Sequence, residues 1–159
     1  MKILVFSDSH GAEQPLIDAI EENKDADVIA FLGDGDRDFE EALAACGIAP
    51  FGPRDSIRIL QVCGNCDRTS MEPVTITSDL GGVKTLITHG HDQNVKFGYA
   101  RLMQQAKKSG CQAAFFGHTH LQTAEEKDGI LLLNPGSIRS GKYAVVTVED
   151  GKTQYELIR

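Results

Sequence analysis

Long apolar runs are missing from this chain of 159 residues, and no segment approaches the length that a membrane-spanning helix needs. Residues 1–6 are apolar but too short for the core of a secretory signal, and they are typical of a first β-strand. We therefore expect a soluble cytoplasmic protein with no membrane partner.

Basic residues are also scarce. The chain has 16 lysines and arginines against 23 acidic residues, which gives a formal net charge of −7. This balance argues against stable, non-specific binding of nucleic acid or anionic lipid, because such binding needs a basic surface. It leaves room for a small phosphorylated substrate, because bound divalent metal ions would be the largest charges in such a site.

Linkers, internal repeats and low-complexity segments are absent as well. Hydrophobic residues make up 41% of the sequence, and its length suits one compact domain better than two. We expect a single domain over residues 1–159. A homodimer is expected only because symmetric dimers are the commonest oligomers.

The four cysteines do not form the pattern of a structural zinc site. Cys63 and Cys66 form a CxxC pair, which could hold half of such a site. The other half would be a second close pair, but Cys46 and Cys111 stand alone, and we expect them to be buried as small apolar side chains. A redox dithiol remains as the alternative for the CxxC pair, although residues 68–73 would begin a helix poorly.

Apolar periodicity and turn residues predict ten strands and three helices. The strands are expected near residues 2–6, 27–32, 56–62, 74–78, 83–88, 112–116, 123–127, 130–133, 143–149 and 152–158. The helices are expected over residues 13–23, 37–46 and 94–109, the last of them ended by Gly110. Residues 47–55 hold two prolines and two glycines, which predicts an irregular loop.

Strand and helix alternate in the first half of the chain, which predicts parallel strands joined by crossover helices. In the last third, Asp128-Gly129 and Asp150-Gly151 have the composition of tight hairpin turns, as does Gly81-Gly82 earlier. We therefore expect a mixed α/β fold in which two packed sheets carry helices on their outer faces.

Histidine, aspartate and asparagine recur just after the predicted strands. The candidate metal ligands in these positions are Asp8, His10, Asp34, Asn65, His89, His118 and His120. Ligands gather beyond the carboxyl ends of strands in α/β sheets, and imidazole with carboxylate suits borderline divalent metals. The backbone could turn sharply or approach the ions at the neighbouring glycines, Gly33, Gly64, Gly90 and Gly117. Each candidate alone would more simply be a turn former or a cap, but seven at successive strand ends predict a metal site.

The order of these blocks resembles the signature of the calcineurin-like metallophosphoesterases. The matching blocks are Asp8-x-His10, Gly33-Asp34, Gly64-Asn65-Cys66-Asp67, His89-Gly90 and Gly117-His118-x-His120. The small size, residues 1–10 and residues 134–137 are similar to the compact prokaryotic phosphodiesterase branch, to which the retromer scaffold subunit is related. The resemblance covers nearly the whole chain.

This resemblance implies a four-layer αββα sandwich, in which two mixed β-sheets are flanked by helices, and a centre with two divalent ions. By motif position, one ion would be held by Asp8, His10 and His120 and the other by Asn65, His89 and His118, with Asp34 bridging them. Manganese is the expected metal, with nickel, iron and zinc as alternatives. Two ions about 3.5–4 Å apart can generate a bridging hydroxide that attacks phosphorus. The implied reaction is hydrolysis of a small phosphate ester, most simply a phosphodiester.

One position departs from the family pattern. Many members have a histidine where this chain has Cys66, and that histidine, oriented by the acid that follows it, protonates the leaving group. Because a thiol would be a poorly oriented donor, we expect aryl diesters to react better than alkyl phosphates. The expected catalytic residues are Asp34, Asn65, Cys66, Asp67 and His91. Cys66 and His91 are alternative proton donors, and His91 could instead support a ligand or lie at the surface.

Other polar residues near the motif blocks have simpler explanations. Ser9 and Ser137 are expected to form turns, because the sequence places no activating base beside them. Arg37, Arg68 and Arg139 are expected in solvent unless they meet the far end of the substrate. The alternative function is a protein-binding scaffold that keeps the fold without physiological catalysis, but seven intact ligand positions favour chemistry.

Overall fold

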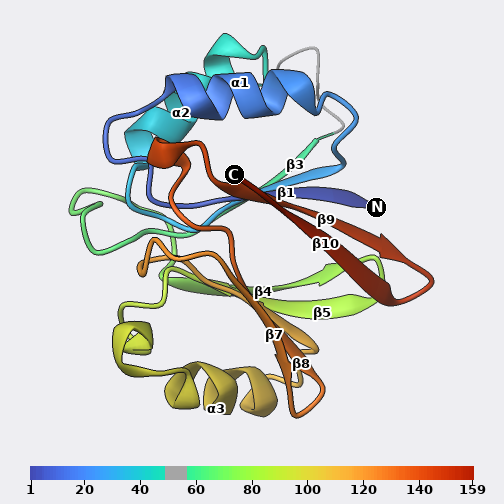
Figure 1. The fold of residues 1–159 in the computed structure, drawn as a ribbon. Helices are drawn as coiled ribbons and strands as arrows, with labels where there is room; N and C mark the ends of the chain where they lie inside the picture. Colours follow the sequence, from blue (N-terminus) through green and yellow to red (C-terminus); the bar gives the residue numbers. More distant parts are fainter. Residues whose placement is uncertain (49–56) are drawn as a thin grey trace.

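The structure, a computed structural model, describes residues 1–48 and 57–159. Within them, ten strands form two five-stranded sheets that pack face to face between two helical layers (Figure 1). The helices α1 (Gln14–Glu22) and α2 (Asp36–Ala45) cover one sheet, and α3 (Ala100–Lys108) covers the other. The expected four-layer αββα sandwich is confirmed.

The first sheet has the strand order β10-β9-β1-β2-β3. Its members are β1 (Lys2–Phe6), β2 (Val28–Phe31), β3 (Arg58–Gln61), β9 (Tyr143–Glu149) and β10 (Lys152–Ile158). β1, β2 and β3 are parallel, as expected for strands joined by crossover helices. β9 is antiparallel to both of its neighbours, β1 and β10.

The second sheet has the strand order β4-β5-β6-β8-β7. Its members are β4 (Thr75–Leu80), β5 (Val83–Thr88), β6 (Ala113–Phe115), β7 (Thr123–Lys127) and β8 (Ile130–Asn134). β5, β6 and β8 are parallel, and hairpins add β4 and β7 at the two edges. All three predicted hairpin turns are confirmed, and both residues of each have positive φ, as tight hairpin turns of this kind require.

β1 is buried on both faces, so its apolar side chains alternate between two cores. Ile3 and Val5 contribute to the core between the sheets, whereas Leu4 and Phe6 pack in the core under α1 and α2. A third core, which includes Leu102 of α3, joins that helix to the second sheet. The three cores fix both sheets relative to the helices and therefore fix where the strands end.

The predicted helix over residues 94–109 is wrong in its first part. A short 3₁₀ helix, η1 (Val95–Phe97), precedes α3, and Gly98 separates the two with a φ of 128°. Asn94 has a left-handed φ of 54° as well, so the backbone changes direction twice before the regular helix begins. Only the second half of the predicted helix forms.

The other predicted elements agree with the structure to within two residues at each end. Most of the predicted loop over residues 47–55, together with residue 56, lies outside the described residues. In the described ranges, no helix is long and apolar enough to cross a membrane.

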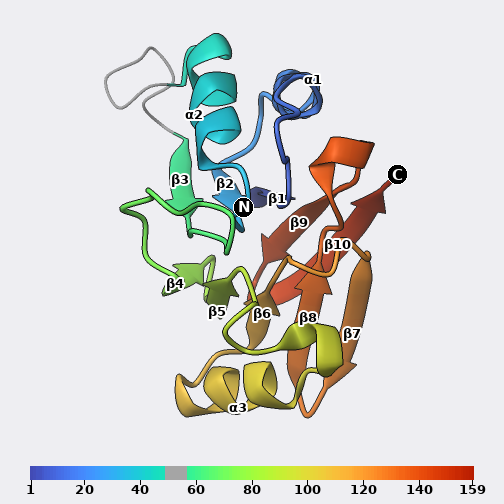
Figure 2. The ribbon, with the colours of Figure 1, turned by 90° about the vertical axis from the view of Figure 1, so that its left-hand side faces the viewer.

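The carboxyl ends of β1, β2, β3, β5 and β6 lie along one edge of the sandwich. The loops that follow these strands face the viewer in Figure 2. Every predicted metal ligand lies in one of these loops, so the fold gathers them at that edge.

Candidate metal centre

The loop after β1 carries Asp8, which is completely buried. Its Oδ2 accepts hydrogen bonds from Ser7 Oγ at 2.6 Å and from the His118 N–H at 3.0 Å. Its Oδ1 makes no hydrogen bond with any described residue and lies 3.1 Å from His120 Nε2 and 3.6 Å from His10 Nε2. A buried carboxylate oxygen without a donor, facing two imidazole nitrogens, suits a cation between them.

His10 and His120 complete this first ligand group. Their Nε2 atoms lie 3.2 Å apart, and one ligand atom from each of Asp8, His10 and His120 falls within 4.8 Å of the others. The side chains of His10 and His120 are 24% and 48% exposed, so the group opens to solvent on one side. Three nitrogen and oxygen ligands with an open side fit one divalent ion that keeps room for a substrate.

Asp34 follows β2 and is 2% exposed. Its Oδ1 accepts the Cys66 N–H at 2.7 Å, and its Oδ2 lies 3.4 Å from His89 Nε2 and 3.9 Å from His10 Nε2. Burial raises the pKa of Asp34, but hydrogen bonds from His89 and Cys66 outweigh it and hold the pKa well below its ordinary value. The carboxylate is therefore ionised and lies between two histidines from different strand ends, as a bridging ligand would.

His89 and His118 form the second ligand group with Asp34, again with ligand atoms within 4.8 Å. His89 is completely buried, and its Nδ1 lies 2.7 Å from the Leu32 carbonyl oxygen. Nδ1 therefore carries a proton, and Nε2, which faces Asp34, is the nitrogen that could bind a metal. His118 Nδ1 lies 3.1 Å from that Nε2. Burial, followed by the charge of His89, lowers the pKa of His118 to about 4, so the ring is neutral at pH 7 and able to bind a metal.

Asn65 lies in the loop after β3 and is exposed. Its amide nitrogen donates to Cys66 Sγ at 3.4 Å, and Cys66 in turn donates through its backbone to Asp34. Asn65 is thus linked to the Asp34 carboxylate through Cys66 and makes no direct contact that would join it to either ligand group among the described hydrogen bonds.

The Asp67 carboxylate binds backbone N–H groups of the loops after β2 and β3. Its two carboxylate oxygens accept backbone N–H groups at 2.7–3.2 Å from Asp34, Gly35, Asp36 and Gly64. Burial raises the pKa of Asp67, but these four hydrogen bonds outweigh it and lower the pKa below its ordinary value. The side chain ties the loop after β2 to the loop after β3, so its contacts position other residues.

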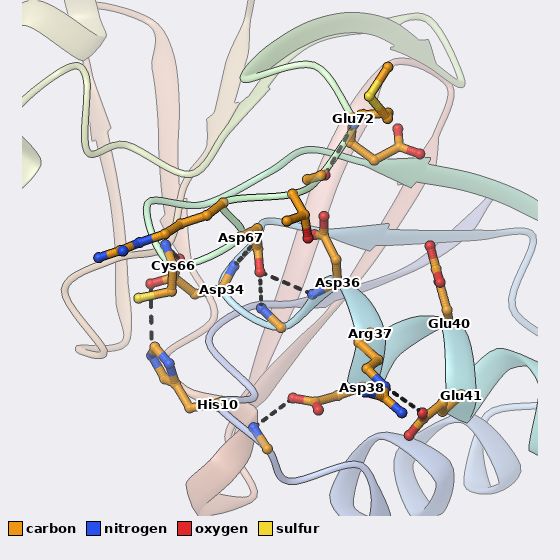
Figure 3. A pocket seen from close by; sticks show the side chains of 16 residues that line it. His10, Asp34, Asp36, Arg37, Asp38, Glu40, Glu41, Cys66, Asp67 and Glu72 are labelled. Carbon is orange, nitrogen blue, oxygen red and sulfur yellow. Dashed lines mark hydrogen bonds and ion pairs between the residues drawn. The ribbon is translucent and has the colours of Figure 1, made fainter.

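The two candidate proton donors both border the ligand groups. The Cys66 sulfur lies with an Asp34 carboxylate oxygen and a His10 ring nitrogen inside 4.8 Å (Figure 3). The His91 ring centre lies 5.4 Å from that of His89 and 6.2 Å from that of His118. Burial, followed by the charge of Asp34, raises the pKa of the Cys66 thiol. The thiol is therefore protonated at neutral pH.

A cleft of about 760 Å³ opens beside the first ligand group, and Figure 3 shows its lining. His10, Asp34 and Cys66 lie at one end of it. Arg37 and Arg68 also line the cleft, and Arg37 Nε pairs at 2.9 Å with the carboxylate of Glu41, another lining residue. Arg37 and Arg68 therefore lie where they could contact the part of a substrate that is farthest from the ligand groups.

Neither serine near the motifs is arranged as a nucleophile. Ser9 Oγ donates to Asp38 Oδ2 at 2.6 Å, and Ser137 Oγ donates to the Asp8 carbonyl oxygen at 2.7 Å. Sequence reasoning missed Asp38, which also accepts the Gly11 N–H at 2.7 Å and so holds the loop after β1. No sequence signal marks this residue, because it lies inside α2 and reads as a helix-surface acid.

Two of the predicted glycine positions are required for close approach. Gly33 has a φ of 93°, and a Cβ atom built there would overlap the backbone of Gly64. A Cβ atom built at Gly64 would overlap the Asp34 carboxylate. Side chains at either position would push apart the two loops that carry Asp34 and Asn65.

Several predicted ligands have a left-handed backbone, with φ between 45° and 67°. They are Asp8, His10, Asp34, His118 and His120. Such values cost a non-glycine residue about 1–2 kcal/mol, and their clustering at one site indicates a functional constraint.

Two ligand groups at the strand ends of an αββα sandwich define a metal-dependent hydrolase. The chain belongs to the calcineurin-like phosphoesterase superfamily, whose domain model matches residues 1–151. Membership implies divalent metal ions, and the two ligand groups provide candidate residues for them.

Curated relatives support this assignment over most of the chain. The chain is 31% identical over 156 residues to the probable metallophosphoesterase YsnB of Bacillus subtilis, covering 94% of this chain and 86% of the relative. It is 32% identical over 146 residues to the phosphodiesterase MJ0936 of Methanocaldococcus jannaschii, covering 86% of this chain and 83% of that one.

Solved structures share the fold. A predicted phosphoesterase from Streptococcus pneumoniae matches with a TM-score of 0.76 at 28% identity, covering 99% of this chain and 88% of that one. Vps29 of Entamoeba histolytica, solved with zinc, matches with a TM-score of 0.72 at 19% identity, covering 99% and 98%. At that identity the second match shows the fold alone, and it confirms the expected likeness to the retromer scaffold subunit.

Proposed function

We propose that this protein is a phosphodiesterase that uses two divalent metal ions, with manganese as the expected metal. Asp8, His10 and His120 would hold one ion, Asn65, His89 and His118 the other, and Asp34 would contact both. The observation that carries the proposal is the position of Asp34, whose buried, ionised carboxylate lies between a histidine of the first group and one of the second.

Two divalent ions held by these residues would supply an activated water molecule at neutral pH and would neutralise charge on the phosphate oxygens. The protein's part is to keep the ligands fixed and in the right protonation state. The Leu32 carbonyl sets the tautomer of His89, and burial keeps His118 neutral. Asp67 holds the two loops that carry Asp34 and Asn65 at a constant separation. Rigid ligands of this kind favour an in-line displacement without a protein nucleophile.

Cys66 and His91 are the residues that could give a proton to the leaving oxygen. The thiol lies beside the ionised Asp34 carboxylate, and burial together with this charge raises the pKa of Cys66 and so keeps the proton on the sulfur. Proton donation from such a group is weak, so the substrate that suits this site has an alcohol that leaves with little protonation. An aryl phosphodiester is the simplest compound of that kind.

The test is hydrolysis of bis(p-nitrophenyl) phosphate with and without manganese. We expect manganese to stimulate the rate, and a chelator or Asp34→Asn to abolish it. Asp25→Asn is a matched control, because Asp25 is 74% exposed and pairs with Lys2 on the surface. Manganese-independent hydrolysis, or full activity in Asp34→Asn, would contradict the proposal. Manganese binding without hydrolysis of any ester would instead favour the scaffold function.

A further inference from the structure

Cys66 takes part in a third possible ligand group that the proposed centre does not use. Ligand atoms from His10, Asp34 and Cys66 all lie within 4.8 Å of one another. His10 and Asp34 are already assigned to the centre, and the sulfur is a soft ligand beside them. Figure 3 shows the sulfur next to the Asp34 carboxylate and on the side that faces His10.

Two hydrogen bonds fix the backbone of the loop that carries the Cys66 sulfur. The Cys66 N–H donates to Asp34 Oδ1 at 2.7 Å, and the next residue, Asp67, accepts the Asp34 N–H at 2.7 Å. Two hydrogen bonds from adjacent residues therefore anchor Cys66 on both the side chain and the backbone of Asp34. The backbone that carries the sulfur is therefore fixed beside His10 and Asp34, two residues assigned to the proposed centre.

A second observation points to a cation at the same place. Asp8 is completely buried, and its Oδ1 lacks a hydrogen-bond donor within the described part of the chain. That oxygen lies 3.6 Å from His10 Nε2, the ring that also borders Cys66. A cation bound to Asp8 Oδ1 would lie beside the His10 ring. The Cys66 sulfur belongs to the same group of ligand atoms as that ring.

We propose that Cys66 is a conditional metal ligand, which binds the first ion when that ion is thiophilic and stays unbound when it is manganese. The inference rests on the proposed two-metal centre. Thiolates select zinc, cadmium and similar ions, whereas manganese prefers oxygen and nitrogen ligands. On binding, the S–H bond is broken, the proton goes to solvent and the sulfur donates an electron pair to the ion, without oxidation or reduction.

The choice of metal would then decide whether the first ion keeps an open position. A bound sulfur fills a coordination position that a substrate oxygen needs, because metal centres that catalyse reactions depend on an open one. We expect the manganese form to be more active than the zinc form on bis(p-nitrophenyl) phosphate. The ratio of manganese to zinc activity should be smaller in Cys66→Ser, because serine offers no soft ligand to zinc.

Cobalt(II) reports directly on sulfur ligation, without any measurement of activity. Titration of the metal-free protein with cobalt should give visible d–d bands together with a near-ultraviolet thiolate-to-cobalt charge-transfer band. Cys66→Ser should keep the d–d bands and lose the charge-transfer band. Cys63→Ser is the matched control, because Cys63 is the other cysteine of the same loop, and it should keep both. In competition titrations, Cys66→Ser should weaken cadmium binding about tenfold or more and leave manganese binding nearly unchanged.

The outcomes separate this inference from the proposed function. Cobalt d–d bands without charge transfer in the wild-type protein, or a charge-transfer band that survives in Cys66→Ser, would overturn the role of Cys66 and leave the metal centre in place. Failure of the protein to take up cobalt or manganese would overturn the metal centre as well.

Discussion

Substitution of His120 by glycine separates the backbone strain of a ligand from its metal-binding role. His120 has a φ of 60°, and its side chain is 48% exposed. Relief of the left-handed strain should stabilise the metal-free protein by about 1–2 kcal/mol. The extra freedom of glycine in the unfolded chain offsets about 0.5–1 kcal/mol of this. We therefore expect His120→Gly without metal to be more stable than wild type by up to about 1.5 kcal/mol.

His120→Ala is the matched control, because alanine also removes the ring but keeps the strained φ. In urea unfolding with a chelator present, the free energy of unfolding of the glycine variant should exceed that of the alanine variant by about 1 kcal/mol. In manganese at 100 times its Kd, the wild type should gain about 2.7 kcal/mol, and both variants should lose most of this gain. Equal stability of the two variants would refute the strain argument. A full manganese gain in both would refute the assignment of His120 as a ligand.

Three further substitutions test single parts of the site. Cys66→His should raise the hydrolysis of alkyl phosphates, because an imidazole is the better proton donor, and an unchanged rate would count against that reasoning. Asp67→Ala should lower the free energy of unfolding by about 3 kcal/mol. Hydrogen bonds to a charged group contribute about 1.5–3 kcal/mol each, but the N–H groups that become exposed regain hydrogen bonds to water, which offsets part of the loss. A loss below about 1 kcal/mol would contradict this role of Asp67. Burial raises the pKa of Asp36 from 3.8 to about 6, so the unfolded chain ionises first, and folded stability should fall as pH rises between these two values and stay level above them. Asp36→Asn should therefore melt higher than wild type at about pH 8 and equally at pH values below about 4, measured in chelator.

Much of the fold follows from apolar patterning and turn chemistry. The apolar run at residues 2–6 predicted a first strand, and the structure adds that Ile3 and Leu4 of this strand pack in different cores. The prediction failed over residues 94–99, which were assigned to the first part of the third helix. Phe97 is 92% exposed there, so it contributes nothing to a buried face. The positive φ values at Asn94 and Gly98 decide the local structure, and periodicity does not contain that information.

The gathering of the candidate ligands at one edge of the fold was predictable from the sequence, but the hydrogen bonds around them were not. Histidine and aspartate after successive strands point to one edge of the fold, because parallel strands end together. The partners of those ligands come from elsewhere in the chain, as with Ser137, whose hydroxyl donates to the Asp8 carbonyl oxygen. The same holds for Asp67, whose contacts with four backbone N–H groups depend on two loops meeting in space. Such contacts leave no mark on sequence spacing.

The hydrogen bonds between loops explain why ligands in a strained backbone remain in register. Beyond the last pair of β1 and β2, the Asp8 N–H donates to the Gly33 carbonyl oxygen at 3.0 Å, and the His10 N–H donates to that of Asp34 at 3.2 Å. These bonds link the two loops just past the ends of the paired strands. The Gly117 N–H likewise donates to the His89 carbonyl oxygen at 3.0 Å, next to the parallel pair β5 and β6.

Because sheet pairing already sets the ligand positions, the folded chain does not need a metal to bring them together. Metal binding should then stabilise a preformed site rather than drive folding, in contrast to small zinc domains that unfold without their ion. The buried Asp34 carboxylate is the cost of that arrangement, because it holds negative charge away from water before any ion arrives. A folded, metal-free protein with reduced stability is therefore the state from which loading begins.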